Sequence, residues 1–238
     1  MSRKSGMSQV LNFLSAGAAQ GLLKALQPAF EAAHGVQLKG RFGAVGAMRE
    51  ALLAGEPCDL LVTTDGMVSE LAAQGRLDAS TRAALGRVRT GVAVRRGEAV
   101  PDVSTPGALR AALLAAKGLY FPDPQRATAG IHFAKVLREL GVHDDLQARF
   151  RTYASGAIAM RELAASAEAG QLGCTQVTEI LYTEGVQLVA VLPPQFELAT
   201  VYAAAVTAGS PQAALARALV QLMAGDGAQA LRQQGGFE

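Results

Sequence analysis

Short apolar runs of strand length alternate with longer Ala- and Leu-rich stretches of helical period along most of this 238-residue chain. Continuous apolar strands are typical of parallel sheets that helices cover on both faces. Residues 10–14 predict the first strand, and residues 18–34 predict the helix that follows, because Leu22, Leu26 and Phe30 recur there at four-residue spacing. The alternation therefore predicts an α/β fold built from successive strand-helix units.

Two β-rich stretches, at about residues 88–95 and 198–207, flank the middle of the chain. A chain whose second lobe is inserted into the first must cross between the lobes twice, and these stretches are the predicted crossings. They divide the chain into an outer lobe of residues 8–87 and 199–238 and an inner lobe of residues 88–198. Each lobe is expected to be a mainly parallel sheet flanked by helices.

Composition and charge exclude several classes of protein. The 22 basic and 20 acidic side chains nearly balance and form no basic stripe, so no nucleic-acid partner is expected. No window reaches about 18 uninterrupted apolar residues, which argues against a membrane-spanning helix. Cys58 and Cys174 lie far apart and form no cluster with histidine. Neither a metal site nor a cofactor is predicted.

The first residues bear on cellular location. Arg3 and Lys4 precede an apolar stretch that ends in small residues, as in a secretory signal. The stretch is short for a signal core and contains Asn12. We therefore interpret Met7 as a natural start and expect a cytoplasmic protein. A periplasmic location is the alternative if a leader has been trimmed from the chain.

Small residues gather at four predicted strand-to-helix junctions, residues 15–19 and 43–47 in the outer lobe and 126–130 and 155–156 in the inner lobe. Ligands of open parallel sheets bind at such junctions, where free N–H groups of helix N-termini favour an anion. The junctions predict a small-anion site across a cleft between the lobes. Its candidate residues, with the end of one later strand, are Ser15, Gly17, Ala18, Ala44, Val45, Gly46, Arg126, Thr128, Ala129, Ser155, Gly156, Thr175 and Gln176.

Several of these segments also carry a family resemblance. Residues 10–17, residues 56–65 between two aspartates, and above all residues 122–141, which begin Pro-Asp-Pro, resemble the molybdate-binding subgroup of the type 2 periplasmic binding proteins. Those proteins are the ligand receptors of ABC importers, and the resemblance spans nearly the whole chain. It implies two α/β lobes that close on a ligand about a hinge. It implies an ABC permease as partner only if the protein is exported.

The chain departs from that family where a tetrahedral oxyanion would bind. Family members use side-chain hydroxyls in the first two loops and a tyrosine in the inner lobe. Here Gly17 stands at the first-loop serine position, residues 43–46 carry no hydroxyl, and the tyrosine position falls near Gln176. Three lost donors, at about 1.5–3 kcal/mol each, disfavour molybdate. The smaller side chains favour an organic carboxylate instead.

Two residue types suit such a ligand. An arginine binds a carboxylate through two parallel hydrogen bonds, and Arg126 in the inner-lobe loop is the first candidate. Arg49 is a weaker one, because an arginine within a helix usually lies on a solvated face. His132, one helical turn beyond the same loop, is the only candidate for a catalytic base.

Two function classes follow from these observations. The first is a solute-binding protein that traps a small anion without chemistry. The alternative is an enzyme, since the chain also resembles aconitate isomerase, an enzyme of the same fold that moves a double bond by allylic proton transfer. A family member that has lost its ligand is a third possibility.

Overall fold

The computed structural model describes residues 9–238, so the predictions on Arg3, Lys4 and Met7 lie outside it. The strands are β1 Gln9–Ala16, β2 Val36–Gly43, β3 Leu60–Thr64, β4 Ala83–Arg95, β5 Gly118–Pro122, β6 Phe150–Tyr153, β7 Gln171–Gln176, β8 Val186–Val191 and β9 Ala199–Val206. The helices are α1 Gln20–His34, α2 Val45–Leu53, α3 Asp65–Ala73, α4 Pro106–Ala115, α5 Thr128–Glu139, α6 His143–Leu146, α7 Gly156–Ala165, α8 Val177–Tyr182, α9 Ala213–Ala224 and α10 Gln229–Gln234. The predicted α/β fold is confirmed.

The sheets are mixed, whereas the sequence predicts mainly parallel ones. The strand order is β2-β1-β3-β9-β4-β7-β5-β6, with β8 beside β4. Parallel pairing joins β1 to β2 and β3, and joins β5 to β6 and β7. Each pairing that involves β4 or β9 is antiparallel. The antiparallel pairings arise because β4 and β9 run in opposite directions between the two halves of the molecule.

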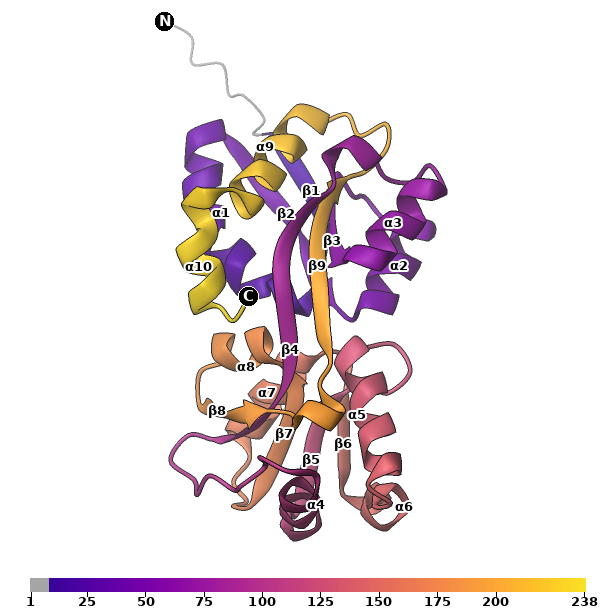
Figure 1. Ribbon diagram of the computed structural model, residues 1–238. Coiled ribbons are helices and arrows are strands. Elements are labelled where there is room, and N and C mark those ends of the chain that lie inside the picture. The colour runs from indigo at the N-terminus through magenta and orange to yellow at the C-terminus, as the bar shows by residue number, and fades with distance from the viewer. Residues whose placement is uncertain (1–8) are drawn as a thin grey trace, which may run out of the picture.

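These two long strands join the halves, which we call the outer lobe (upper in Figure 1) and the inner lobe (lower in Figure 1). Strand β4 pairs with β9 as far as Arg89 and with β7 from Thr90 onward. The change of partner within one strand is the point where the chain enters the inner lobe. The predicted lobe boundaries lie within β4, at residue 88, and at the start of β9, at residue 199. That the lobes move as units with these boundaries stays a prediction.

Helices cover both faces of the outer-lobe sheet, and successive side chains of its strands pack against helices on opposite faces. Leu11 and Phe13 of β1 pack with α1 and α9, whereas Leu14 packs with α2 and α3 on the opposite face. Side chains of a strand alternate between faces, so both faces need an apolar cover. Burying a leucine side chain such as Leu11 contributes about 1.5–3 kcal/mol.

The inner lobe follows the same plan. Phe121 of β5 and Cys174 of β7 pack with α4 and α5, and Ala93 of β4 packs with α7 and α8 on the other face. Both cysteines of the chain are free thiols. Within residues 9–238 no helix has the length and apolar character of a membrane span.

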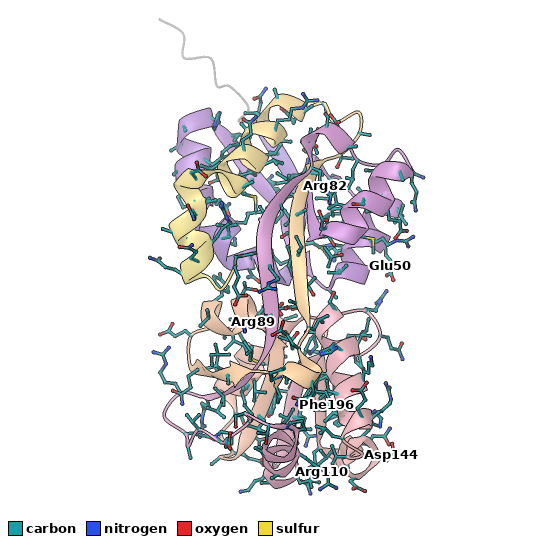
Figure 2. The ribbon with its side chains drawn as sticks, viewed as in Figure 1. Glu50, Arg82, Arg89, Arg110, Asp144 and Phe196 are labelled. Atoms are coloured by element: carbon teal, nitrogen blue, oxygen red, sulfur yellow. The ribbon has the colours of Figure 1, made fainter. Side chains whose placement is uncertain are left out.

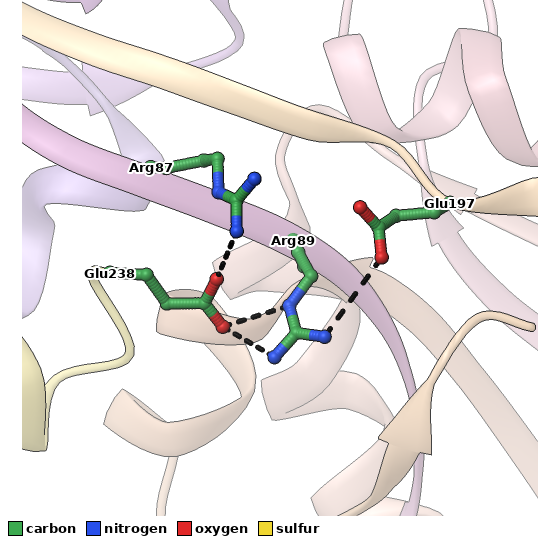
Figure 3. Close-up of polar contacts among 4 residues, drawn as sticks. All are labelled: Arg87, Arg89, Glu197 and Glu238. Atoms are coloured by element: carbon green, nitrogen blue, oxygen red, sulfur yellow. Dashed lines mark hydrogen bonds and ion pairs between the residues drawn. The ribbon is translucent and has the colours of Figure 1, made fainter. Parts of the chain in front are cut away.

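An ion cluster covers the crossing at β4. Arg87 and Arg89 both bind the carboxylate of Glu238, and Arg89 also lies 4.0 Å from Glu197 beside β9 (Figure 3). The backbones of Arg87 and Glu238 exchange two 2.8 Å hydrogen bonds. The cluster therefore ties the last residue of the chain to the strand that links the lobes.

Candidate functional site

A small cavity lies between the lobes, where helix N-termini from both of them meet. Its free volume is about 20 Å³, close to the space of one water molecule. The lining residues are Ala16, Gly17, Ala18, Gly43, Ala44, Val45, Pro122, Ala127, Thr128, Ala129, Ser155, Gly156, Gln176, Glu179 and Tyr202. A small dicarboxylate exceeds this volume, so it requires the lobes to part or the lining side chains to shift.

The first turns of α2 and α5 lie at this cavity, and of their N–H groups that of Gly46 donates to the carbonyl of Arg126. Their N-cap residues, Ala44 and Ala127, make no side-chain capping hydrogen bond. By contrast, Thr105, at the N-terminus of α4 away from the cavity, accepts a 3.1 Å bond from Ala108 N. Unsatisfied N–H groups at a helix N-terminus attract negative charge. The cavity is thus walled by backbone donors from both lobes.

A single carboxyl group, that of Glu179, projects into this space from α8. The Glu179 side chain accepts a 2.5 Å hydrogen bond from Thr175 Oγ1 and a 3.2 Å bond from Ala157 N. The residue is only 6% exposed. Burial raises the pKa of the Glu179 carboxyl, while donors from Thr175, Ala157, Gln176 and Gly156 act to lower it. Burial stabilises the protonated form of Glu179 and the hydrogen-bond donors stabilise its carboxylate, so the site contains features that favour each form.

Two glycines make room for that carboxyl. A Cβ atom at Gly17 of the outer lobe would lie 2.2 Å from Glu179 Oε1, and a Cβ atom at Gly156 of the inner lobe would lie 2.0 Å from Glu179 Oε2. Both distances are far below van der Waals contact. The carboxyl therefore lies between the two lobes and contacts a loop of each.

Two further polar side chains line the cavity. Gln176 is 3% exposed, and neither amide atom of its side chain has a hydrogen-bond partner within residues 9–238. Leaving such a buried group unpaired costs about 1–3 kcal/mol. Tyr202 of β9 is fully buried, and burial together with the nearby Glu179 raises the pKa of its hydroxyl. That hydroxyl lies near Thr128 and Gln176.

Most of the predicted site residues lie together around the cavity. They are Gly17, Ala18, Ala44, Val45, Thr128, Ala129, Ser155, Gly156 and Gln176. Ser15, Gly46, Arg126 and Thr175 do not line it. The Ser15 hydroxyl is buried and donates to the carbonyl of Ala16, and Thr175 reaches the cavity only through Glu179. Ligand contact by the lining residues stays a prediction.

The structure places Arg126 at the rim of the cavity, and ligand contact by this residue stays a prediction. Its guanidinium binds Glu50 of α2, and the two side chains are 51% and 53% exposed. Glu50 lies on the edge of the outer lobe nearest the inner lobe (Figure 2). The carbonyl of Arg126 also accepts a 3.2 Å bond from Gly46 N. Arg126 and Gly46 therefore join the lobes at the rim, because the Arg126 side chain reaches across the cleft rather than into it.

Arg49 and His132 also have partners elsewhere. Arg49 forms a 3.1 Å ion pair with Glu70. The Nε2 atom of His132 lies 2.7 Å from the carbonyl oxygen of Phe196, which only accepts, so His132 donates its proton there. That bond leaves His132 outside the cavity and unsuited to be the base.

Sequence reasoning missed Glu179 and Tyr202. The chain around Glu179, Val-Thr-Glu-Ile-Leu-Tyr, is rich in strand-forming residues and shows no helical period, yet it forms α8. Tyr202 lies in an apolar run whose buried faces look alike in sequence. One available signal was a lone glutamate directly after a buried strand, at the same kind of junction as the predicted loops.

The sequence profile of a bacterial extracellular solute-binding protein family matches residues 11–238. The chain belongs to this family. Among curated proteins, an aconitate isomerase of a Pseudomonas species is 28% identical over 235 residues, covering 94% of this chain and 86% of that protein.

Solved structures of solute-binding proteins share the fold. The periplasmic molybdate-binding protein of Azotobacter vinelandii superposes with a TM-score of 0.78 at 21% identity, over 96% of this chain and 98% of that one. The sulfate-binding protein of Mycobacterium tuberculosis superposes with a TM-score of 0.73 at 20% identity, over 96% and 86%. The resemblance expected from the sequence is therefore confirmed at the level of family and fold.

Proposed function

We propose that this solute-binding protein traps a small organic carboxylate between its lobes. The observation that carries the proposal is the buried, unpartnered amide of Gln176 at a cavity walled by helix N-termini. Its amide N–H groups suit a carboxylate oxygen. Its carbonyl oxygen can accept a hydrogen bond from the nearby Tyr202 hydroxyl or from a hydroxyl or protonated carboxyl of an organic acid, a donor that fully ionised molybdate or sulfate lacks.

Glu179 supports the same choice. An ionised Glu179 would repel the oxygens of a dianionic oxyanion, whereas the neutral acid, which burial favours, can donate to an oxygen of either class of ligand. An organic acid tolerates either form of Glu179, because it can present a C–H group or a hydroxyl to that oxygen.

A ligand screen by thermal unfolding tests the binding proposal. A carboxylate at about 100 times its Kd should stabilise the protein by about 2.7 kcal/mol, which raises Tm by roughly 5–10 °C for a chain of this length. The panel contains molybdate, tungstate, sulfate, phosphate, and di- and tricarboxylates. A large shift with molybdate and none with carboxylates would overturn the proposal.

The variant Gln176→Leu sharpens the screen. Loss of the amide should weaken carboxylate binding about 10- to 100-fold, as measured by calorimetry. Gln171→Leu is the matched control, because Gln171 is equally buried on β7 but bonds to Glu168 away from the cavity. If the two variants bound the carboxylate with equal affinity, Gln176 would not be a ligand-binding residue.

A second candidate function is an isomerase that shifts a double bond in a polycarboxylate by allylic proton transfer. It is supported by Glu179, a buried carboxyl at the cavity, and by the 28% identity to an aconitate isomerase. Isomerisation of cis- or trans-aconitate, followed by proton NMR, tests it. Unchanged substrate after hours with protein that binds it would reject this candidate.

Location and lobe motion are separate proposals. The family is described as extracellular, whereas the N-terminal sequence led us to expect the cytoplasm. Fractionation of the native cells distinguishes a cytoplasmic from an extracellular location.

We further propose that residues 88–198 move as one unit about β4 and β9. A radius of gyration that decreases when a carboxylate binds supports this motion.

A further inference from the structure

We propose that Glu179 is the catalytic residue of the cleft, the group that removes a proton from one carbon of a bound unsaturated polycarboxylate and returns it to the allylic carbon two positions away. This role rests on the isomerase candidate above. It names the base of that reaction and assigns it to a residue of α8 that contacts both lobes.

The position of the carboxyl is the first support. Glu179 lines the cavity and lies against Gly17 of the outer lobe and Gly156 of the inner lobe. A ligand that fills the cavity therefore contacts this carboxyl directly. Any larger residue at either glycine would collide with the oxygens of the Glu179 carboxyl.

The surroundings of the carboxyl are the second support. Thr175 Oγ1 and Ala157 N donate to its two oxygens at 2.5 and 3.2 Å. They hold the carboxyl in one orientation and stabilise its charged form, while burial stabilises the protonated form. A base must hold and release a proton in the same site, and these opposing effects permit both.

The other titratable groups do not fit the role of base. Tyr202 is the other titratable side chain among the lining residues, and burial raises the pKa of its hydroxyl, so it remains protonated. His132 donates to the carbonyl of Phe196, and Arg126 binds Glu50 at the rim. Among residues 9–238 no lysine or arginine lines the cavity, so no cation of these residues holds Glu179 permanently ionised.

The step balances with these groups alone. The Glu179 carboxylate takes a proton from the saturated carbon next to the double bond. The electrons of that C–H bond delocalise over three carbons and the adjoining substrate carboxylate. The new carboxylic acid then protonates the far carbon, which completes the shift of the double bond and restores the Glu179 carboxylate. Tyr202 and the N–H groups of α2 and α5 can stabilise the charge on the substrate oxygens.

The confined space adds a consequence for the proton. The cavity holds about one water molecule, and Glu179 is 6% exposed. When the lobes close over the substrate and keep Glu179 buried, a proton on its carboxyl exchanges slowly with the solvent during a turnover. In deuterated water the product should carry less than one deuterium at the newly saturated carbon, because part of the original proton is returned.

The test uses the full chain with cis- and trans-aconitate in deuterated water, followed by proton NMR. Glu179→Gln should lose about 10²- to 10⁴-fold of the rate, the usual contribution of a positioned base. It should still be stabilised by aconitate in thermal unfolding. Glu184→Gln, a change of an exposed carboxylate just beyond α8, should keep the wild-type rate.

Each result has a distinct meaning. A wild-type protein that binds aconitate without isomerising it defeats the isomerase candidate and this proposal, whereas carboxylate binding survives. An active wild type with an equally active Glu179→Gln variant defeats only the role of Glu179. If Glu179→Gln does not fold, Glu179→Asp replaces it and should lower kcat far more than it changes KM. An Asp variant with wild-type kcat would overturn the proposal.

Discussion

The interior of the cleft and its rim are built from different chemistry. The interior holds backbone N–H groups, neutral amide and hydroxyl groups, and one carboxyl, with no cation among the lining residues. The rim holds an exposed ion pair of Arg126 with Glu50, and the crossing at β4 holds a partly exposed pair of Arg89 with Glu238 (Figure 3). The groups that line the cavity are therefore mostly buried, whereas the ion pairs at the rim and at β4 lie where water screens their charges.

The largest expected effect comes from filling the interior. In Gly156→Ala the new Cβ would lie 1.9 Å from Thr175 Oγ1 and 2.0 Å from Glu179 Oε2. Overpacking of this kind costs about 1–3 kcal/mol of unfolding free energy, and the distorted site should lose ligand-induced stabilisation. Both are measured by chemical denaturation with and without carboxylate.

Gly107→Ala is the control for that change. Gly107 lies in the first turn of α4, where a Cβ would meet no atom within 4 Å. This variant should be as stable as wild type or more stable by about 0.4–1 kcal/mol. If Gly156→Ala behaves in the same way, the interior is not packed as described.

The next effect is a pH dependence of the unfolding free energy, which Glu179 in the interior of the cleft should cause. Because the folded state raises the pKa of Glu179, it holds a proton that the unfolded chain has already released. The associated stability is complete below the ordinary glutamate pKa and is lost as pH rises through the raised pKa, by up to about 1.4 kcal/mol per pH unit. Glu179→Gln should flatten this part of the profile.

The acid limb of the profile has the opposite sign and belongs to the surface. Hydrogen bonds hold the pKa values of Glu31, Asp78 and Asp102 below their ordinary ones, so their contributions are lost as pH falls. Glu179→Gln should leave that limb unchanged. A flat wild-type profile above the ordinary glutamate pKa would contradict the buried-acid description of Glu179.

The smallest effect is expected at the rim. Arg126→Ala removes an exposed pair that contributes about 0.2–1 kcal/mol, so carboxylate affinity should fall by no more than about fivefold through weaker closure. Calorimetry at low and high salt measures it. Arg82→Ala breaks an exposed pair with Asp65 within the outer lobe and should leave affinity unchanged. A loss of carboxylate affinity above 100-fold in Arg126→Ala would instead indicate that Arg126 contacts the ligand directly.

Most of the fold and much of the cavity wall could be predicted from local patterns. The apolar run at residues 10–14 and the spacing of Leu22, Leu26 and Phe30 specify β1 and α1, because burial on a defined face requires that periodicity. Small residues at Gly17 and Gly156 marked two of the loops. Helix N-termini at strand ends follow from connectivity, so the loops at the cavity were accessible to sequence reasoning.

Glu179, Tyr202 and Arg126 were not predictable in the same way. The six residues of α8 have strand-like composition, and their helical form depends on packing against α7 and β8. Whether Arg126 points into the cleft or across it depends on the distance to Glu50, which lies 76 residues away in the chain.

The sequence by itself determined the α/β architecture, the two crossings and the small-residue loops, since each depends on neighbours within a turn or a strand. Only the tertiary structure decided that a carboxyl from a short, patternless helix lies between two glycines of opposite lobes and that the expected arginine lies at the rim. Contacts between distant segments set these features, because burial and charge pairing act through space and not along the chain.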